Sequence, residues 1–234
     1  MNKRMLRWTI AFLGASCAWM MVAGANAQMR GMMGGPQPRG FFNPIVGSGA
    51  QYEISTADGK KMTMETDVVG KESVNGKDGY WFESVVANPQ SGDMVMKMLL
   101  VPDPNSTGPV KMIMQMPGRP PMEMPMQMGQ MGRMGGNQNP PTTDIRTQAE
   151  DLGTESVTTP AGTFQAHHYR MKDGSGDSWI SEKVAPYGLI KHQGKDSSMV
   201  LTKVVTDAKD RITGTPVPFN PMGMMGGMGG GPQQ

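Results

Sequence analysis

The 234-residue sequence contains a single cysteine and only three histidines, which rules out a disulfide-stapled fold and leaves few nitrogen ligands for metals. Leu, Ile, Val and Phe together make up about 16% of the chain, below the roughly 20% usual for folded proteins. Such a low content indicates disorder only when net charge is high, and here the formal net charge is +2. The composition therefore favours one modest domain, with much of its apolar mass supplied by 27 methionines.

The first 27 residues have the three regions of a secretory signal peptide. An apolar run over residues 8–22 follows a basic start and precedes the small–x–small sequence Ala25-Asn26-Ala27. We therefore expect cleavage after Ala27, a periplasmic or secreted protein, and no transmembrane span after cleavage. Lipid attachment at Cys17 is the alternative processing route.

Removal of residues 1–27 changes the charge and the chemistry of the chain. The leader carries three basic residues, no acidic residue and the only cysteine, so the mature chain has a formal net charge of −1 and no thiol. A nearly neutral chain offers no electrostatic surface for nucleic acid. We therefore expect no nucleic-acid partner and no thiolate metal site.

Three stretches of the mature chain are rich in Met, Gly and Pro: residues 28–44, 117–141 and 213–234. Glycine at this density makes ordering costly in entropy, so 28–44 and 213–234 are predicted to be disordered tails. Residues 45–212 are predicted to form a single β domain, interrupted by a long methionine-rich loop over 117–141.

Turn signals divide that domain into strands. Asp58-Gly59 and Asn75-Gly76 separate runs of strand-forming residues, and Thr159-Pro160-Ala161-Gly162 fits a type I turn. The spacing predicts a mainly β fold, a curled antiparallel half-barrel meander of about nine to eleven strands. No segment is predicted to form an amphipathic helix of useful length; the best candidates are Ile145–Leu152 and the short turn Ser181–Ala185.

A segment of the second half resembles a known group of proteins. The run Thr159-Pro160-Ala161-Gly162-Thr163-Phe164, followed by Trp179-Ile180-Ser181 and Gly188-Leu189-Ile190-Lys191, is similar to exported bacterial proteins of the LolA/LolB-like lipoprotein-carrier superfamily. The similarity covers residues 153–206. It implies a curled sheet whose concave face holds lipid acyl chains, and it transfers no individual functional residue to this chain.

Methionines at alternate positions of predicted strands indicate the inward face of the sheet, either as part of the core or as the lining of a binding cavity. Alternate residues of a strand share one face, and flexible thioethers suit an adaptable apolar surface. We therefore predict a non-enzymatic envelope protein that binds an apolar small molecule, such as a lipid or acyl chain, or a segment of an envelope protein, with residues 117–141 as a lid. The predicted ligand-binding residues are Met94, Met96, Met98, Met112, Met114 and Met116.

Three alternative functions fit the same composition. Thioether sulfur prefers Cu(I) and Ag(I), so the loop methionines could bind a soft metal, with copper(I) as cofactor. Exposed methionines could instead buffer oxidants by cycling through the sulfoxide. The third alternative is a structural component of the cell envelope. The residues of the metal hypothesis are Met122, Met124, Met126 and Met128.

Catalytic motifs are missing from the sequence. It contains no G-x-S-x-G, no H-E-x-x-H and no phosphate-binding P-loop. Glu65 and Asp67 alternate with Met62 and Met64, a pattern typical of a solvated strand face. We therefore expect no enzymatic activity and, outside the copper hypothesis, no cofactor.

Overall fold

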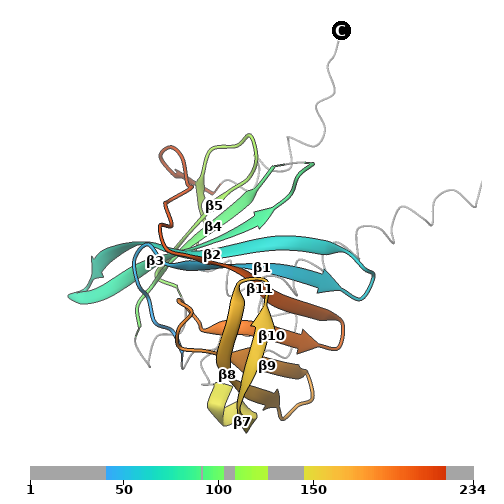
Figure 1. The fold of residues 1–234 in the computed structure, drawn as a ribbon. Helices are drawn as coiled ribbons and strands as arrows, with labels where there is room; N and C mark the ends of the chain where they lie inside the picture. The colour runs from blue at the N-terminus through green and yellow to red at the C-terminus, as the bar shows by residue number, and fades with distance from the viewer. Residues whose placement is uncertain (1–40, 91, 103–108, 126–144, 220–234) are drawn as a thin grey trace, which may run out of the picture. The chain divides into compact units, whose positions relative to one another are not determined.

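The computed structural model describes residues 41–90, 92–102, 109–125 and 145–219, and these form one large β-sheet (Figure 1). Its first half is a meander in which each strand pairs with the next along the chain. The strands are β1 (Gly49–Thr56), β2 (Lys61–Val74), β3 (Lys77–Ala87), β4 (Met94–Leu100), β5 (Lys111–Gln115) and β6 (Met122–Glu123).

The second half adds the other arm of the sheet. It begins with one short helix, α3 (Ile145–Gln148), and its last strand pairs with β6. The strands are β7 (Ala149–Thr159), β8 (Gly162–Met171), β9 (Gly176–Ile180), β10 (Leu189–Gly194), β11 (Ser197–Val205) and β12 (Val217–Pro218).

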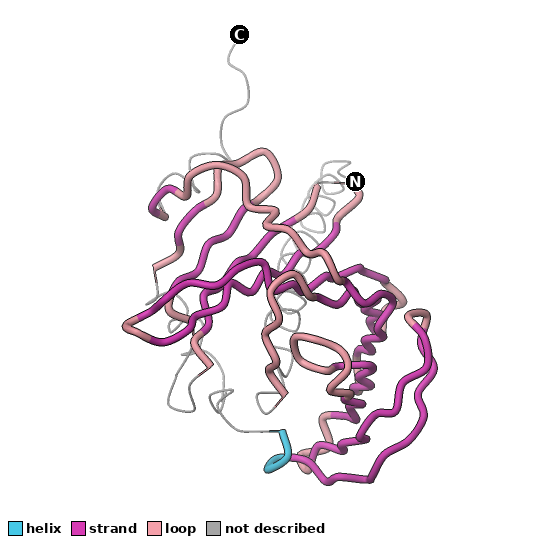
Figure 2. Tube along the Cα trace, turned by 60° about the vertical axis from the view of Figure 1, so that its left-hand side comes forward, coloured by secondary structure: helices cyan, strands magenta, loops and turns pink. Residues whose placement is uncertain are grey.

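The twelve strands lie in the order β12-β6-β5-β4-β3-β2-β1-β11-β10-β9-β8-β7. Pairing of β1 with β11 joins the two arms, and every strand pair is antiparallel except β12 with β6. Figure 2 shows the strands curving round part of the loop structure. The predicted mainly β fold, a curled antiparallel sheet, is confirmed; the count exceeds the expected nine to eleven because β6 and β12 are two-residue strands.

The turn predictions are confirmed. Asp58-Gly59 connects β1 to β2, and Asn75-Gly76 connects β2 to β3 with φ values of 50° and 78°. Positive φ at both central positions is the requirement of the tight hairpin turn that Asn-Gly favours. Pro160-Ala161 connects β7 to β8. The hairpin that these two strands form is long enough for β7 to contact β11 (Figure 1).

A loop between β9 and β10 contributes Val184 and Tyr187 to two of the buried hydrophobic clusters. Tyr187 packs its ring against Phe82 of β3 and against Phe42, with ring centroids 5.2 Å apart in both pairs. The chain before β1 is fixed here because the backbone N–H of Asn43 donates to the carbonyl of Pro186 at 2.8 Å. Large aromatic rings bury the most apolar area per residue, so this cluster anchors the loop on the sheet.

The chain after β11 runs back across the sheet to its far edge, and we call residues 207–219 the strap. The backbone N–H of Ala208 donates to the carbonyl of Gly47 at 2.8 Å, and that of Thr213 donates to the side chain of Gln115 at 3.0 Å. The strap then ends in β12, parallel to β6. It therefore connects the middle of the sheet to its last two strands.

Three expectations about local structure need correction. The helix candidate Ile145–Leu152 is helical only over Ile145–Gln148, because Ala149 onward pairs with β8. The other candidate, Ser181–Ala185, forms turns, with Val184 in the hydrophobic core and Glu182 and Lys183 exposed. Met122 was expected to lack a strand partner, yet it pairs with Met114 and with Val217, which belongs to the predicted C-terminal tail.

Candidate functional site

Strands β4, β5 and β6, together with Met124 directly after β6, place seven methionines on one face of the sheet, which we call the methionine face. On β4, alternate residues Met94, Met96 and Met98 project to the same side. Directly opposed residues of antiparallel strands also share a side, which extends the face to β5 and β6. Its members are Met94, Met96, Met98, Met112, Met114, Met122 and Met124.

Register aligns six of these methionines into two rows that run across the strands. In the first row, Met114 lies opposite Met96 on one side and opposite Met122 on the other. In the second row, Met112 lies opposite Met98 and accepts a hydrogen bond from the backbone N–H of Met124 at 2.9 Å. Opposed Cβ atoms in such pairs are about 5 Å apart, so each row brings three thioethers into mutual reach.

The second row is part of the hydrophobic core. Met98 is 8% exposed and clusters with Phe82 and Tyr187, and Met112 packs against the same cluster. Met96 joins this cluster from the first row. The thioethers nearest Tyr187 are thus accounted for by packing alone.

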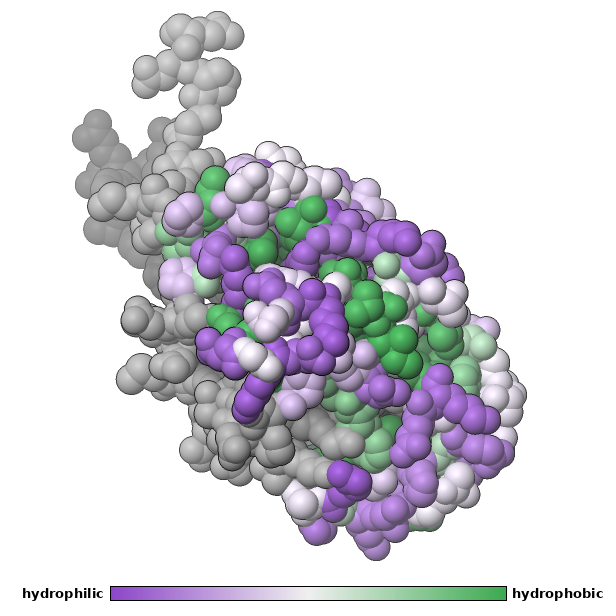
Figure 3. Space-filling model, turned by 90° about the vertical axis from the view of Figure 1, so that its left-hand side faces the viewer, coloured by the Kyte–Doolittle hydropathy of each residue, from purple (hydrophilic) through white to green (hydrophobic). Residues whose placement is uncertain are grey.

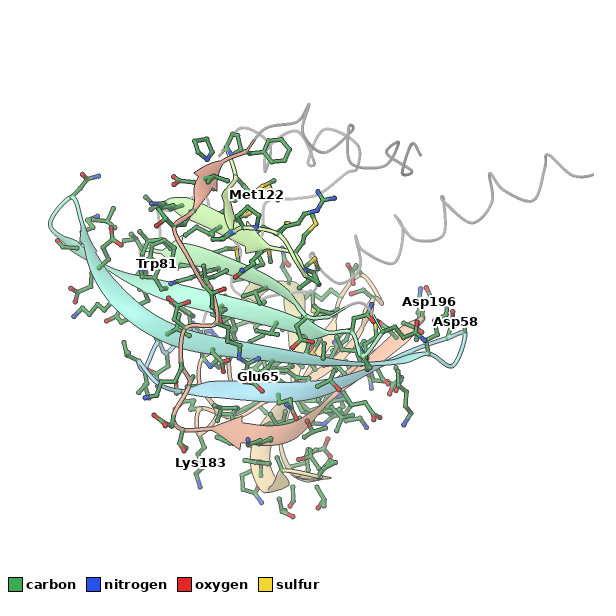
Figure 4. All side chains as sticks on the ribbon, turned by 90° about the horizontal axis from the view of Figure 1, so that it is seen from above. Asp58, Glu65, Trp81, Met122, Lys183 and Asp196 are labelled. Atoms are coloured by element: carbon green, nitrogen blue, oxygen red, sulfur yellow. The ribbon has the colours of Figure 1, made fainter. Side chains whose placement is uncertain are left out.

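The first row continues beyond that cluster. Met114 and Met122 are half-buried, and within the described ranges neither belongs to a cluster of buried hydrophobic residues. Figure 4 shows sulfur atoms gathered near the labelled Met122, and the space-filling view of Figure 3 shows apolar patches between polar side chains. These two methionines are the part of the face that packing does not explain.

Most residues predicted for the ligand site lie together. Met94, Met96, Met98, Met112 and Met114 share the methionine face, whereas Met116 lies one residue beyond the end of β5. Of the residues in the metal hypothesis, Met122 and Met124 adjoin β5, and Met126 and Met128 lie outside the described residues. Most of the predicted lid, residues 126–141, also lies outside them.

The opposite face of the sheet carries a buried acidic cluster formed by Glu65, Asp67 and Glu83. Asp67 lies opposite Glu83 across β2 and β3, and both residues are 0% exposed. Glu65 is 8% exposed, and its carboxylate pairs with the Arg211 guanidinium. The expectation that Glu65 and Asp67 form a solvated face is therefore wrong, because both are buried and Arg211 of the strap lies against both carboxyl groups.

Arg211 from the strap is the main cation of this cluster. Its guanidinium Nη2 lies 4.0 Å from Asp67 Oδ2, and in the described part of the chain neither Asp67 carboxyl oxygen has a hydrogen-bond partner. Gly49 of β1 lies against the same carboxyl, and a Cβ built there would be 1.8 Å from Asp67 Oδ1. Glycine at position 49 is thus required by the close approach of the carboxyl group.

Burial sets the protonation of the two innermost carboxyls. Desolvation, reinforced by the neighbouring charge of Glu65, raises the pKa of Asp67 to about 7. Desolvation also raises the pKa of Glu83 to about 7, although the Arg211 backbone N–H and the Lys97 ammonium act in the opposite direction. The Asp67 and Glu83 carboxyl groups therefore both titrate near neutral pH.

A second polar arrangement lies on β8, β9 and β10. The His168 ring stacks on Trp179 with centroids 4.4 Å apart, and Lys191 Nζ lies 4.7 Å from the centroid of the Trp179 ring. His168 also contacts the carboxylates of Glu155 and Asp177, each at 3.3 Å. His168 therefore sits between an aromatic ring and two carboxylates from neighbouring strands.

Neither polar arrangement provides a hard-metal centre. Among the described residues, no group of three or more His, Cys, Asp or Glu side chains is placed to hold a metal ion. None of the described helices has the length and apolarity needed to cross a membrane. The soft thioethers of the methionine face are thus the most distinctive chemical feature of the described chain.

No protein-family model matches the sequence, and no curated protein does. Solved structures show distant likenesses only. A candidate lipoprotein from Parabacteroides distasonis has a TM-score of 0.34 and 16% identity, covering 70% of this chain and 97% of that one. A candidate exported protein with a YmcC-like fold, from Bacteroides fragilis, has the same TM-score and identity over 70% and 98%.

MucB in the Pseudomonas aeruginosa MucA/MucB complex gives a TM-score of 0.39 at 6% identity, over 74% of this chain and 56% of that chain. This chain therefore spans little more than half the length of MucB. The similarity is structural and its sequence identity is very low. The functional argument accordingly rests on the residues of this chain.

Proposed function

We propose that the protein is a non-enzymatic, exported envelope protein that binds an apolar ligand, a lipid acyl chain or an apolar segment of an envelope protein, on the methionine face. The observation that carries this proposal is that seven methionines share one face of the sheet and six of them align in two rows across β4, β5 and the segment that begins with β6. The signal-peptide sequence of residues 1–27 supports export.

The physical reason lies in the side chain that the face repeats. Methionine is unbranched and polarizable, so a surface built from it adapts to apolar partners of different shape. The first row adds two half-buried thioethers, Met114 and Met122, next to the packed core. A ligand covering them would bury apolar area at about 25 cal/mol per Å².

Binding can be tested with a fluorescent fatty acid and the protein purified after expression of the full-length gene. Replacing Met114 and Met122 by glutamine keeps the side-chain length but adds a polar amide, so we expect affinity to fall at least tenfold. The matched variant with leucine at both positions keeps the apolar surface and should bind like the parent protein. Circular dichroism of both variants checks that the sheet is intact.

A lipid ligand and a peptide partner can be distinguished by identifying the molecules that co-purify with this protein. Native mass spectrometry of the purified protein detects a co-purifying lipid directly, whereas a peptide partner requires a screen of apolar envelope-protein segments. Equal fatty-acid affinity in the glutamine and leucine variants would place binding elsewhere and reject the methionine face as the site. The lack of either ligand class would reject the proposed function.

A further inference from the structure

We infer that the first row of the methionine face, Met96, Met114 and Met122, is a binding site for a soft monovalent cation, Cu(I) or Ag(I). This inference concerns the same face as the proposed function but does not depend on it. The sequence hypothesis relied on loop methionines, two of which lie outside the described residues. The register instead selects three residues from three different strands.

Strand geometry makes three-sulfur coordination feasible. Met114 is the central residue, with Met96 opposite it on β4 and Met122 opposite it on β6. The outer two residues are two strand spacings apart, about 10 Å between backbones. Each methionine has three rotatable side-chain torsions, so the outer thioethers can lean toward the central one without movement of the backbone.

The chemical surroundings favour a soft cation of low charge. The neighbours that extend the row are Ser84 on β3 and Val217 on β12, so the row begins and ends in uncharged side chains. Lys97 and Glu123 alternate with the row methionines and project to the other face. Neutral thioethers without carboxylates select Cu(I) and Ag(I) and disfavour hard divalent ions.

Packing distinguishes this row from the second one. Met98 and Met112 pack with Phe82 and Tyr187, and Met98 is 8% exposed, so a metal there would have to displace core contacts. In the first row only Met96 packs against this cluster, whereas Met114 and Met122 are half-buried and lie outside the buried clusters described above. Two of the three first-row thioethers therefore lie outside the packed core and can turn toward an ion, and Met96 contributes from the edge of the cluster.

Anaerobic titration with Cu(I) against a chromogenic chelator, using the full-length gene product, tests the inference. We expect one tightly bound Cu(I) per chain and at least a tenfold loss of affinity in the triple variant M96L/M114L/M122L. Leucine keeps the apolar surface, so fatty-acid binding should persist in this variant. Loss of metal binding is thereby separated from failure of the proposed function.

A matched triple variant, M64L/M171L/M199L, removes the same number of thioethers from other strands and should leave Cu(I) affinity unchanged. In methyl NMR spectra, Ag(I) should shift the ε-methyl signals of Met96, Met114 and Met122 together. Equal Cu(I) affinity in parent and row variant, or Ag(I) shifts confined to other methionines, would overturn the assignment. Thermal unfolding without metal verifies that both triple variants are folded.

Discussion

The backbone N–H of Arg211 donates to both carboxylate oxygens of Glu83, each at 3.2 Å, although 128 positions separate the two residues. The same residue directs its guanidinium at Glu65 and Asp67. Arg211 therefore holds the strap against three carboxyl groups on the face of the sheet opposite the methionine face. Because the strap ends in the edge strand β12, this contact also supports the adjacent strand β6, which carries Met122.

Replacing Arg211 by methionine should destabilise the fold. The variant keeps the apolar length and the backbone hydrogen bonds but leaves Glu65 and Asp67 without their guanidinium. Removing one partner of a buried ion pair costs about 3–5 kcal/mol, and the 40% exposure of the Arg211 side chain reduces this to about 1–3 kcal/mol. Urea denaturation measures the loss.

The matched control for that variant is Lys209→Met, two positions away on the same strap. Lys209 pairs with Asp207, but the side chains are 76% and 82% exposed. Exposed pairs contribute little, so we expect no measurable change in unfolding free energy. Equal effects of the two variants would show that the Arg211 guanidinium contributes no more to stability than an exposed cation and would contradict its role in the acidic cluster.

Stability should decrease as pH rises from 5 to 8. The folded pKa of Asp67 and that of Glu83 are raised to about 7, whereas the same carboxyls titrate near 4 when unfolded. Between these values the folded state binds more protons than the unfolded state, so the unfolding free energy falls with increasing pH. We expect a decrease of at least about 1 kcal/mol across this interval, measured by urea denaturation at each pH.

His192 has the opposite effect on the pH dependence of stability, so a control variant is needed that retains this histidine. Burial lowers the pKa of His192, so its contribution to stability increases as pH rises toward neutrality. The double variant Asp67→Asn with Glu83→Gln retains His192 but removes both raised carboxyls. The difference between parent and variant curves therefore isolates the acidic cluster, and parallel curves would contradict its role.

The fold was largely predictable because its signals are local. Asn75-Gly76 needs only two residues to specify a hairpin, and the alternation of Met94, Met96 and Met98 needs one strand to define a face. Pairing between β5 and β6 was missed because Met122 lies in a stretch of Pro, Gly and Met without strand periodicity. Its register is fixed by β12, about 95 residues later in the chain.

The acidic cluster was missed for a related reason. Glu65 and Asp67 alternate with apolar residues, and that pattern is the same whether the polar face meets water or a covering segment. The segment that covers them contains Arg211 within a charged, turn-rich stretch that itself has the pattern of an exposed loop. Only the three-dimensional path of the strap distinguishes the two cases.

Replacing Gly49 by alanine should destabilise the protein strongly. The added Cβ would lie 1.8 Å from Asp67 Oδ1 and 2.7 Å from the carbonyl oxygen of Thr66, so both strands must shift. We expect a loss of about 3 kcal/mol or more in unfolding free energy, as for overpacked sites. Combining it with Asp67→Ala should restore part of that loss, because the closest clash is removed.

Gly70→Ala on β2 is the control for this effect. A Cβ there would have its closest contact at 3.6 Å, with the Trp81 side chain, an ordinary van der Waals distance. We expect a change below about 1 kcal/mol in the same denaturation assay. If Gly49→Ala and Gly70→Ala lowered the unfolding free energy by the same small amount, the close contact between Gly49 and the Asp67 carboxyl group would be contradicted.

Oxidation should separate the two rows of the methionine face. Sulfoxide formation follows the exposure of the sulfur, so dilute hydrogen peroxide should modify Met114 and Met122 several-fold faster than the buried Met98 of the second row. Met171, which is buried on β8 outside both rows, serves as a second slow reference. Peptide mass spectrometry over a time course gives each rate, and pre-incubation with Ag(I) should slow oxidation of the first row selectively. Uniform oxidation rates at all four methionines would show that packing does not distinguish the rows. Fast oxidation of the first row without protection by Ag(I) would favour the oxidant-buffering hypothesis over the metal site.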